Sequence, residues 1–268
     1  MDDALPDELA ARLRVVGIDP DVPLRDENSP WPIWLRLRER YGRRATLIDL
    51  YHLEATRQAV PPEALPAADR ARLKAAALPV IFPGFAEAPW TGHRGEGIEV
   101  VGYDPDWPRR FRQWQERLAA ALGTAAVRID HVGSTSVPGL AAKPVIDVQV
   151  SVSDLSDEES YVPAVESAGL VLRSREDARR FFRPPPGTPR EVHVHVCQAG
   201  GRWEREHLLF RDYLRARPEA RAQYGELKRE LAAAWHDDRA GYTEAKSGFI
   251  LDTLDDAGQW AVATGWHP

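Results

Sequence analysis

The residues best suited to chemistry lie where a polar turn separates two apolar stretches of the chain. Gly133 and Ser134 directly follow a β-like run, and Asp147 lies inside the next apolar run. A carboxylate within an apolar strand is costly unless it is paired or binds a cation, and a glycine lets backbone N–H groups approach a ligand closely. The turn amides, the Ser134 hydroxyl and Asp147 are therefore suited to holding a nucleotide triphosphate with Mg²⁺.

The residue two positions after Asp147 limits the number of metal ions that this site can hold. Gln149 faces the same side as Asp147 because side chains alternate along a strand. Glutamine offers a carbonyl oxygen to a metal but no negative charge, whereas a two-metal site normally needs several carboxylates. The sequence therefore favours one cation, with Asp147 and Gln149 as candidate ligands.

Two histidines on a later strand form a second candidate cluster. Valine alternates with histidine along residues 191–197, so His193 and His195 share one face. Such residues lie about 6.6 Å apart and can converge on one ligand. We interpret both as candidate metal ligands and, with Asp147, as candidate catalytic residues that work near neutral pH. The alternative is that they only form hydrogen bonds across the sheet.

Several further residues are candidates for contacting or neutralising phosphate. They extend the turn or supply positive charge from the loop before residue 145, from a later strand and from C-terminal helices. With Gly133 and Ser134, the predicted phosphate contacts are Thr135, Lys143, Arg183, Arg211, Lys228, Tyr242 and Lys246. The alternatives are a structural ion pair between Asp147 and Lys143 or an arginine, and a solvated helix face for Tyr242 and Lys246, which lie four residues apart.

The elements that must position these residues are predicted to be of mixed type, giving an α/β or α+β fold. Strands are predicted at 98–103, 127–132, 145–152, 170–172, 181–182 and 191–197. An amphipathic helix is expected after residue 108, since Phe111, Trp114, Leu118 and Leu122 are three or four apart. Further helices are predicted at 160–168, 204–215, 219–235 and 239–262.

The first part of the chain has a different pattern and predicts a small helical extension. Helices are expected at 31–41, 45–59 and 67–77, the last one stopped by Pro79. Residues 83–97 are rich in glycine and proline and predict a linker. We therefore divide the chain into an extension at 1–95, of unknown role, and a main domain at 96–268. A lid over the cleft, a partner surface and simple stabilisation are all open roles for the extension.

Composition excludes several classes of protein. The chain has 268 residues, 43% of them hydrophobic and 28% charged, as expected for a globular protein of about two domains. No apolar run is long enough to span a membrane, the N-terminus does not resemble a secretory signal, and Cys197 is the single cysteine. We expect a cytoplasmic protein with no membrane partner. The net charge of −6 disfavours nucleic acid as a partner.

Five separated motifs in order give the chain a specific resemblance. HVGSTSVPGLAAKPVIDVQV, which begins at His131, is similar to the signature of the GrpB family (UPF0157). Matching segments are YDPDWPRRF from Tyr103, HVHV from His193, LLFRDYLRARPEA from Leu208 and DDRAGYTEAKSGFI from Asp237. The resemblance covers roughly residues 98–255.

This resemblance implies a nucleotidyltransferase-like mixed sheet with a helical C-terminal part. That superfamily uses a Gly-Ser turn and an Asp-x-Asp/Glu pair on neighbouring strands, and Gly133-Ser134 and Asp147-Val148-Gln149 occupy those places. Gln149 departs from the acidic pair. GrpB-like domains are also found fused to dephospho-CoA kinase, but this chain has no Gly-x4-Gly-Lys-Ser/Thr phosphate loop.

The resulting hypothesis is binding of a nucleotide triphosphate with Mg²⁺ and transfer of a nucleoside monophosphate to an unknown acceptor. One alternative, which Gln149 favours, is a non-catalytic domain that binds a nucleotide or CoA-like ligand or acts as a folding or assembly partner. Another is a hydrolytic metal site built on His193 and His195. The fold by itself does not select among these functions.

Overall fold

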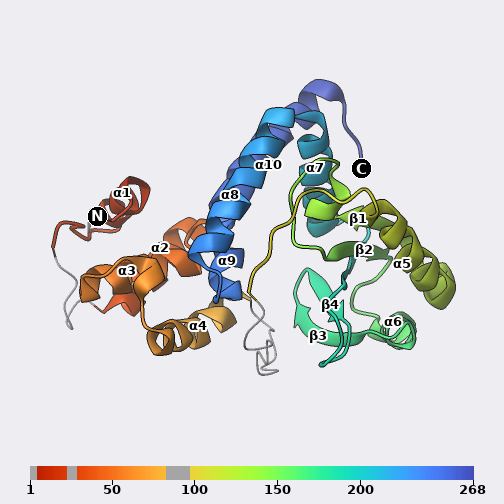
Figure 1. Ribbon diagram of the computed structural model, residues 1–268, viewed down its shortest axis with the longest axis horizontal. Helices are drawn as coiled ribbons and strands as arrows, with labels where there is room; N and C mark the ends of the chain where they lie inside the picture. Colours follow the sequence, from red (N-terminus) through yellow and green to blue (C-terminus); the bar gives the residue numbers. More distant parts are fainter. Residues whose placement is uncertain (1–4, 23–28, 83–96) are drawn as a thin grey trace. The chain divides into compact units, whose positions relative to one another are not determined.

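The chain folds into two compact units (Figure 1). The computed structural model describes residues 5–22, 29–82 and 97–268. One unit comprises Met1–Pro83 and Ala233–Leu251, and the other comprises Gly84–Ala232 and Asp252–Pro268. The units differ from the division expected at 95/96, because residues 233–251 group with the N-terminal helices. The linker predicted at 83–97 lies outside the described residues except for Gly97.

The second unit is built on a five-stranded mixed sheet (Figure 1). Its strand order is β1-β2-β5-β4-β3, in which β2 and β5 are parallel and all other neighbours are antiparallel. This sheet with its helices confirms the predicted α+β class. The strands are β1 (Ala126–Val132), β2 (Ile146–Val152), β3 (Val171–Glu176), β4 (Arg179–Arg183) and β5 (Val192–Gln198).

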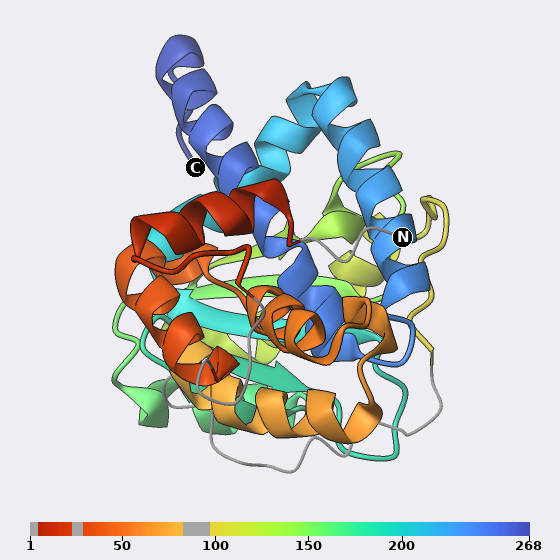
Figure 2. The same ribbon diagram turned by 90° about the vertical axis from the view of Figure 1, so that its left-hand side faces the viewer.

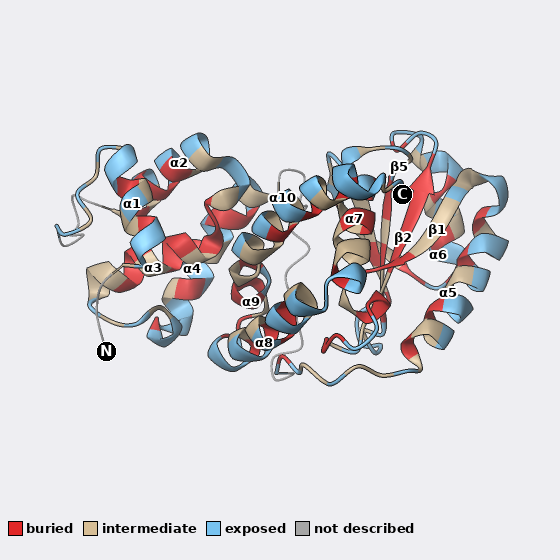
Figure 3. Ribbon diagram, turned by 90° about the horizontal axis from the view of Figure 1, so that it is seen from above, coloured by how far each residue is buried: buried red, intermediate tan, exposed pale blue. Residues whose placement is uncertain are grey.

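One face of the sheet is an apolar core. Alternate residues from Ile146 to Val152 in β2 and from Val192 to Val196 in β5, an isoleucine and six valines, are at most 1% exposed, and both strands are coloured largely as buried in Figure 3. They pack with α5 (Trp107–Leu122) and α6 (Val162–Ser167). Helix α5 has Pro108 in its first turn and ends at Gly123, where φ is 51°. Full burial of a valine or leucine side chain contributes about 1.5–3 kcal/mol.

The opposite face of the sheet carries polar side chains and is contacted by α7 (Arg202–Ala216). The alternation of β2 and β5 places Asp147, Gln149, His193 and His195 on this face. Glu204 of α7 accepts a hydrogen bond of 3.0 Å from the Ser151 hydroxyl. Helix α7 therefore contacts the sheet partly through polar groups.

Three expectations about element boundaries were wrong. Residues 98–103 contribute only an isolated bridge between Val101 and Ala142. Helix α4 (Ala67–Ile81) contains Pro79 within its last turn instead of stopping there. The helix predicted at 239–262 is two helices, α9 (Arg239–Ala245) and α10 (Ser247–Thr264). Helix α8 (Pro218–Ala234) agrees with its prediction.

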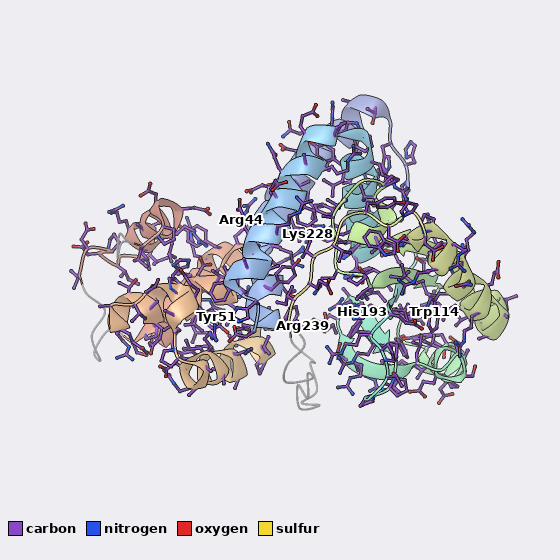
Figure 4. The ribbon with its side chains drawn as sticks, in the orientation of Figure 1. Arg44, Tyr51, Trp114, His193, Lys228 and Arg239 are labelled. Carbon is purple, nitrogen blue, oxygen red and sulfur yellow. The ribbon has the colours of Figure 1, made fainter. Side chains whose placement is uncertain are left out.

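The first unit is helical, as Figure 2 shows face on. It contains α1 (Asp7–Val15), which the sequence did not predict, α2 (Pro30–Tyr41), α3 (Leu47–Gln58) and α4. Thr46 and Asp49 form a capping box at the start of α3. Tyr51, labelled in Figure 4, donates a 2.8 Å hydrogen bond from its hydroxyl to Asp238, one of the contacts between residues 233–251 and the N-terminal helices of this unit.

No helix in the described part of the chain has the length and apolar character needed to cross a membrane.

Candidate functional site

The glycine turn and Asp147 lie against each other at the end of β1. Strand pairing places Asp147 opposite Val132, the residue before Gly133. Gly133 has a φ of +68°, and a Cβ added there would lie 2.3 Å from Asp147 Oδ2. Position 133 therefore requires glycine both for its backbone conformation and for the space that the carboxylate occupies.

Both histidines of β5 point at the same carboxylate. The parallel register sets Asp147 beside His193, and Asp147 Oδ1 lies 3.3 Å from His193 Nδ1 and 3.5 Å from His195 Nε2. Burial acts to raise the pKa of Asp147, but the hydrogen bonds from the two histidines outweigh it and hold the pKa well below its ordinary value. The three predicted catalytic residues thus form one cluster, centred on an ionised aspartate.

A neighbouring arginine determines which ring nitrogen of His195 carries the proton. Arg179 Nη1 lies 2.9 Å from His195 Nδ1, and a guanidinium can only donate. His195 Nδ1 therefore accepts, and its proton lies on Nε2, which faces Asp147. Burial lowers the pKa of His195 to about 4, so the ring is neutral near pH 7. Both ring nitrogens are engaged, so His195 offers no lone pair to a metal or to a substrate proton.

His193 differs from His195 because, among the described residues, only one of its ring nitrogens has a polar partner. Its Nδ1 is directed at Asp147, which leaves Nε2 to carry the lone pair. The His193 side chain is 23% exposed, and Figure 4 labels it beside the sheet strands. Of the two predicted acid–base histidines, His193 is the one arranged to accept a proton.

Arg179 is a site residue that the sequence did not single out. Glu176 holds it with two hydrogen bonds, of 3.0 and 2.9 Å. Its guanidinium carbon lies 5.6 Å from the Phe181 ring and 5.9 Å from the Trp203 ring, within the range of cation–π contacts. Side-chain alternation along β4 could have predicted that Arg179 shares a face with Phe181, because the two residues are two positions apart. No local sequence pattern predicts the contact with Trp203.

The three hydroxyl groups of the turn have different roles. Thr135 donates to the Val145 carbonyl at 3.2 Å, so its oxygen accepts the 3.0 Å hydrogen bond from His131 Nε2. Ser136 donates to the Gly133 carbonyl at 2.6 Å. Thr135, predicted to contact phosphate, is buried and holds the turn instead. Among the described residues, the Ser134 hydroxyl has no hydrogen-bond partner.

The four predicted metal ligands do not form a four-residue metal site. Gln149 is fully buried, and within the described chain neither of its amide atoms has a hydrogen-bond partner. No group of three or more His, Cys, Asp or Glu among the described residues is arranged to hold a metal. Mg²⁺ is commonly held by one or two carboxylates with water and phosphate oxygens. Asp147 therefore fits one Mg²⁺ carried largely by a phosphate ligand, and the residues do not fit two metal ions.

Two of the predicted phosphate contacts on C-terminal helices hold backbone carbonyls instead. Lys228 of α8, labelled in Figure 4, is 2% exposed, and its ammonium donates to the Ala141 carbonyl. Arg211 of α7 donates to the His131 carbonyl at 3.2 Å. Both cations therefore fix the segment that carries the turn. For Lys228 the prediction was wrong, because burial removes its side chain from any exposed ligand.

The remaining predicted contacts are divided between the two units. Arg183 ends β4 on the same face as Phe181 by strand alternation, and Lys143 lies in the loop before β2. Tyr242 and Lys246 belong to the other unit, where the Lys246 ammonium lies 4.5 Å from the centre of the Tyr242 ring. Arg183 and Lys143 thus remain candidates, whereas Tyr242 and Lys246 are not part of the sheet unit.

A mixed sheet with a glycine turn set against a strand aspartate matches a known class of protein. Residues 97–256 match the family described as GrpB protein, so this chain belongs to the GrpB family. The chain is 45% identical to a UPF0157 protein of Streptomyces coelicolor over 161 residues, which is 60% of this chain and 84% of that protein. These matches confirm the resemblance seen in the sequence.

Two further relatives extend the comparison. The crystal structure of conserved protein GrpB from Enterococcus faecalis superimposes with a TM-score of 0.56 at 34% identity, covering 60% of this chain and 99% of that one. A protein named dephospho-CoA kinase from Mycolicibacterium paratuberculosis is 33% identical over 199 residues, or 64% of this chain but 48% of that protein. The structural match supports the fold of the sheet unit.

Proposed function

We propose that this chain binds a nucleotide or a related phosphate ester, together with one Mg²⁺, where the Gly133 turn meets Asp147. The observation that carries the proposal is the close approach of the Asp147 carboxylate to Gly133, where a Cβ would lie 2.3 Å from Oδ2. An ionised carboxylate beside a glycine turn is suited to a cation and to the phosphate that accompanies it.

The charge of Asp147 makes a cation necessary for this ligand. Two anions held a few ångströms apart repel each other strongly in a partly buried site. Mg²⁺ would supply the positive charge between Asp147 and the phosphate, and Arg183 and Lys143 are the predicted cationic contacts that remain candidates. The Ser134 hydroxyl would donate to a phosphate oxygen. We therefore expect binding to depend on Mg²⁺.

A CoA-type ligand is included in the proposal because of a relative's name. The match to the protein named dephospho-CoA kinase spans less than half of that protein, and the present chain lacks the Gly-x4-Gly-Lys-Ser/Thr phosphate loop. Because this phosphate loop is absent, the region that the two proteins share is not expected to carry out the kinase reaction through such a motif. Recognition of a nucleotide or CoA-like phosphate by this domain is consistent with both facts.

Transfer of a nucleoside monophosphate is the second candidate function, and His193 favours it. With Nδ1 held by Asp147, His193 Nε2 can take the proton of an acceptor hydroxyl. The acceptor oxygen would then bond to the α-phosphorus while the bond to the pyrophosphate oxygen breaks. Gln149 favours the alternative of binding without transfer, or a role as a folding or assembly partner, because the second carboxylate is absent.

Isothermal titration of the full chain with ATP, GTP, CTP and CoA, each with and without Mg²⁺, tests the binding proposal. Asp147→Asn keeps the shape of the side chain and removes its charge, so we expect Mg²⁺-dependent affinity to fall at least about tenfold, the equivalent of about 1.4 kcal/mol. Asp157→Asn, an exposed position, is the matched control. Unchanged affinity in Asp147→Asn would contradict the proposal.

Two measurements separate transfer from binding and from the hydrolytic metal site. Pyrophosphate release with a mixed pool of acceptors should require His193, so His193→Gln abolishes release while nucleotide binding persists. Release that survives in His193→Gln contradicts the role of that residue as base. Zinc in the purified protein that is lost in the double variant His193→Ala/His195→Ala would instead support the metal-dependent hydrolase.

A further inference from the structure

A cavity lies beside β1, the edge strand of the sheet, and is also lined by Ser136 and Pro138 of the segment that follows Gly133. It has a volume of about 380 Å³, within the range of small-molecule sites. Helix α5 lines it with Phe111 and Arg112, β1 lines it with His131, and α7 lines it with Arg211 and Arg215. No step of the proposed function uses this cavity.

Three of the motifs that mark the sequence converge on this cavity. The segment from Tyr103 to Phe111 contributes a tyrosine, a proline and a phenylalanine, the segment that begins at His131 contributes the histidine and residues of the turn, and the segment that begins at Leu208 contributes both α7 arginines. These segments are remote in the chain and meet here through the fold. The site at Asp147 does not account for the first of them.

The cavity is locally cationic in a chain whose net charge is −6. Asp212 pairs with Arg211 at 2.7 Å and with Arg215 at 3.2 Å. Across the cavity, the exposed Arg112 forms neither a hydrogen bond nor an ion pair with any described residue. Among the described residues that line the cavity, Arg112, Arg211 and Arg215 are cationic and Asp130 is the one carboxylate. Asp130 is paired with Arg128 and lies 3.6 Å from Arg211.

The floor of the cavity is apolar and aromatic. The rings of His131 and Phe111 stack with centroids 4.6 Å apart and planes 5° apart, and Ile129 lies beside them. Burial lowers the pKa of His131 to about 4, so this ring is neutral near pH 7 and adds no positive charge. An anionic group at the arginines and an apolar body on the floor would therefore satisfy the two parts of the cavity.

We propose that this cavity is a second ligand site that takes a small phosphomonoester with an apolar or aromatic body. A planar guanidinium group can bind two phosphate oxygens at once. Arg112 of α5 and Arg215 of α7 both line the cavity, and Arg215 is held in place there by hydrogen bonds of 3.1 and 2.8 Å to the Ser136 carbonyl. The phosphate would contact these arginines while the body of the ligand covers Phe111 and His131. The inference does not depend on nucleotide binding at Asp147.

Titration of the full chain with phenyl phosphate, inorganic phosphate and phenol tests the site. We expect phenyl phosphate to bind more tightly than either fragment, because it engages both the arginines and the floor. Arg112→Ala should weaken phenyl phosphate binding about tenfold without affecting folding, since Arg112 is exposed. Arg109→Ala removes the same charge from an exposed position of α5 that does not line the cavity, and binding should stay unchanged.

Other outcomes overturn the inference in distinguishable ways. Equal loss in Arg112→Ala and Arg109→Ala would show a general charge effect and no site. Equal affinity for phenyl phosphate and inorganic phosphate would remove the role of the floor. Loss of phenyl phosphate binding in Ser134→Ala, with Arg112→Ala unaffected, would place the probe at the Asp147 site. If ATP does not bind to the chain at all, the proposed function is contradicted, whereas the phosphomonoester site is not affected by that result.

Discussion

The two faces of strands β2 and β5 show how one stretch of chain serves two purposes. On one face Ile146 and the valines are at most 1% exposed and pack with α5 and α6. On the other face, one residue further along, the Asp147 carboxylate contacts both His193 and His195, at 3.3 and 3.5 Å. The apolar face needs only shape and hydrophobicity, whereas the polar face needs a partner for each donor and acceptor.

The polar face contains a departure from that requirement. Gln149 is fully buried, and both of its amide atoms are without a hydrogen-bond partner in the described structure. Its strand neighbours on either side are Asp130 and His195, which are already engaged with Arg128 and with Arg179 and Asp147. Unsatisfied buried polar atoms cost stability. Burial of the apolar face therefore has to offset the free-energy cost of the polar groups on the other face.

Adjacent phenylalanines on β4 give the largest expected contrast between the faces. Phe182 is fully buried on the apolar face, whereas Phe181 stacks on His195 with ring centroids 5.2 Å apart. We expect Phe182→Ala to lower the free energy of unfolding by about 3–5 kcal/mol, and Phe181→Ala by clearly less. Urea unfolding of both variants measures the difference. Equal losses would mean that the polar face is part of the stabilising core.

The alternation of valine and histidine allowed the side chains on one face of β5 to be predicted from the sequence. The pattern at 191–197 correctly placed His193 and His195 on one face, and this prediction rests on local periodicity. The prediction that Gly133 and Asp147 belong to one site rests on a glycine turn after one strand and a carboxylate within the next, and the two residues do lie in contact. The partners of His195 could not be read in this way, because Arg179 and Trp203 reach it through the pairing of β4 with β5 and the packing of α7.

Burial was the other quantity that the sequence did not supply. Lys228 and Thr135 have side chains suited to phosphate, but the fold uses them to hold the Ala141 and Val145 carbonyls. A lysine on an amphipathic helix is normally expected at the surface. Only the packing of α8 on the segment after the turn shows that its ammonium is enclosed.

Neutral, buried histidines make the stability of the sheet unit depend on pH. Burial holds the pKa of His131 and of His195 at about 4, below the ordinary 6.5. Between these values the unfolded chain binds protons that the folded chain does not, so stability is full above pH 6.5 and falls as the pH drops toward 4. Each pKa unit is worth about 1.4 kcal/mol, so we expect a loss of roughly 3 kcal/mol or more.

Denaturation at a series of pH values between 7 and 4.5 measures this slope. His195→Gln should flatten it, because the side chain that resists protonation has been removed. His267→Gln changes an exposed residue near the C-terminus and serves as the control. A slope that is identical in all three proteins would show that folding does not lower the pKa of His195.

Two glycines with nearly the same positive φ allow the contact at the turn to be compared. Gly133 and Gly200 have φ values of +68° and +69°, but a Cβ at Gly133 would meet Asp147 Oδ2 at 2.3 Å while one at Gly200 would meet nothing within 4 Å. Both substitutions to alanine carry the backbone strain of about 1–2 kcal/mol. We expect Gly133→Ala to cost about 1–3 kcal/mol more, together with loss of Mg²⁺-dependent nucleotide affinity. Equal costs in thermal unfolding would show that the carboxylate moves aside freely.

Arg179 provides the smallest and most specific test of the polar face. Because it only donates, it requires His195 to carry its proton on Nε2, and the ring ¹⁵N shifts of His195 should report that tautomer in the folded protein. Arg179→Gln should mix the tautomers at a cost of about 1 kcal/mol, and Arg179→Lys should keep Nε2 protonated while losing the paired contact with Glu176. Arg175→Gln, which affects an exposed pair with Glu158, should leave the shifts unchanged. A proton on Nδ1 of His195 in the unmodified protein would contradict this arrangement. In the arrangement, Arg179 fixes His195 as a donor to Asp147, and His193 contacts Asp147 through Nδ1 and keeps Nε2 to act as a base.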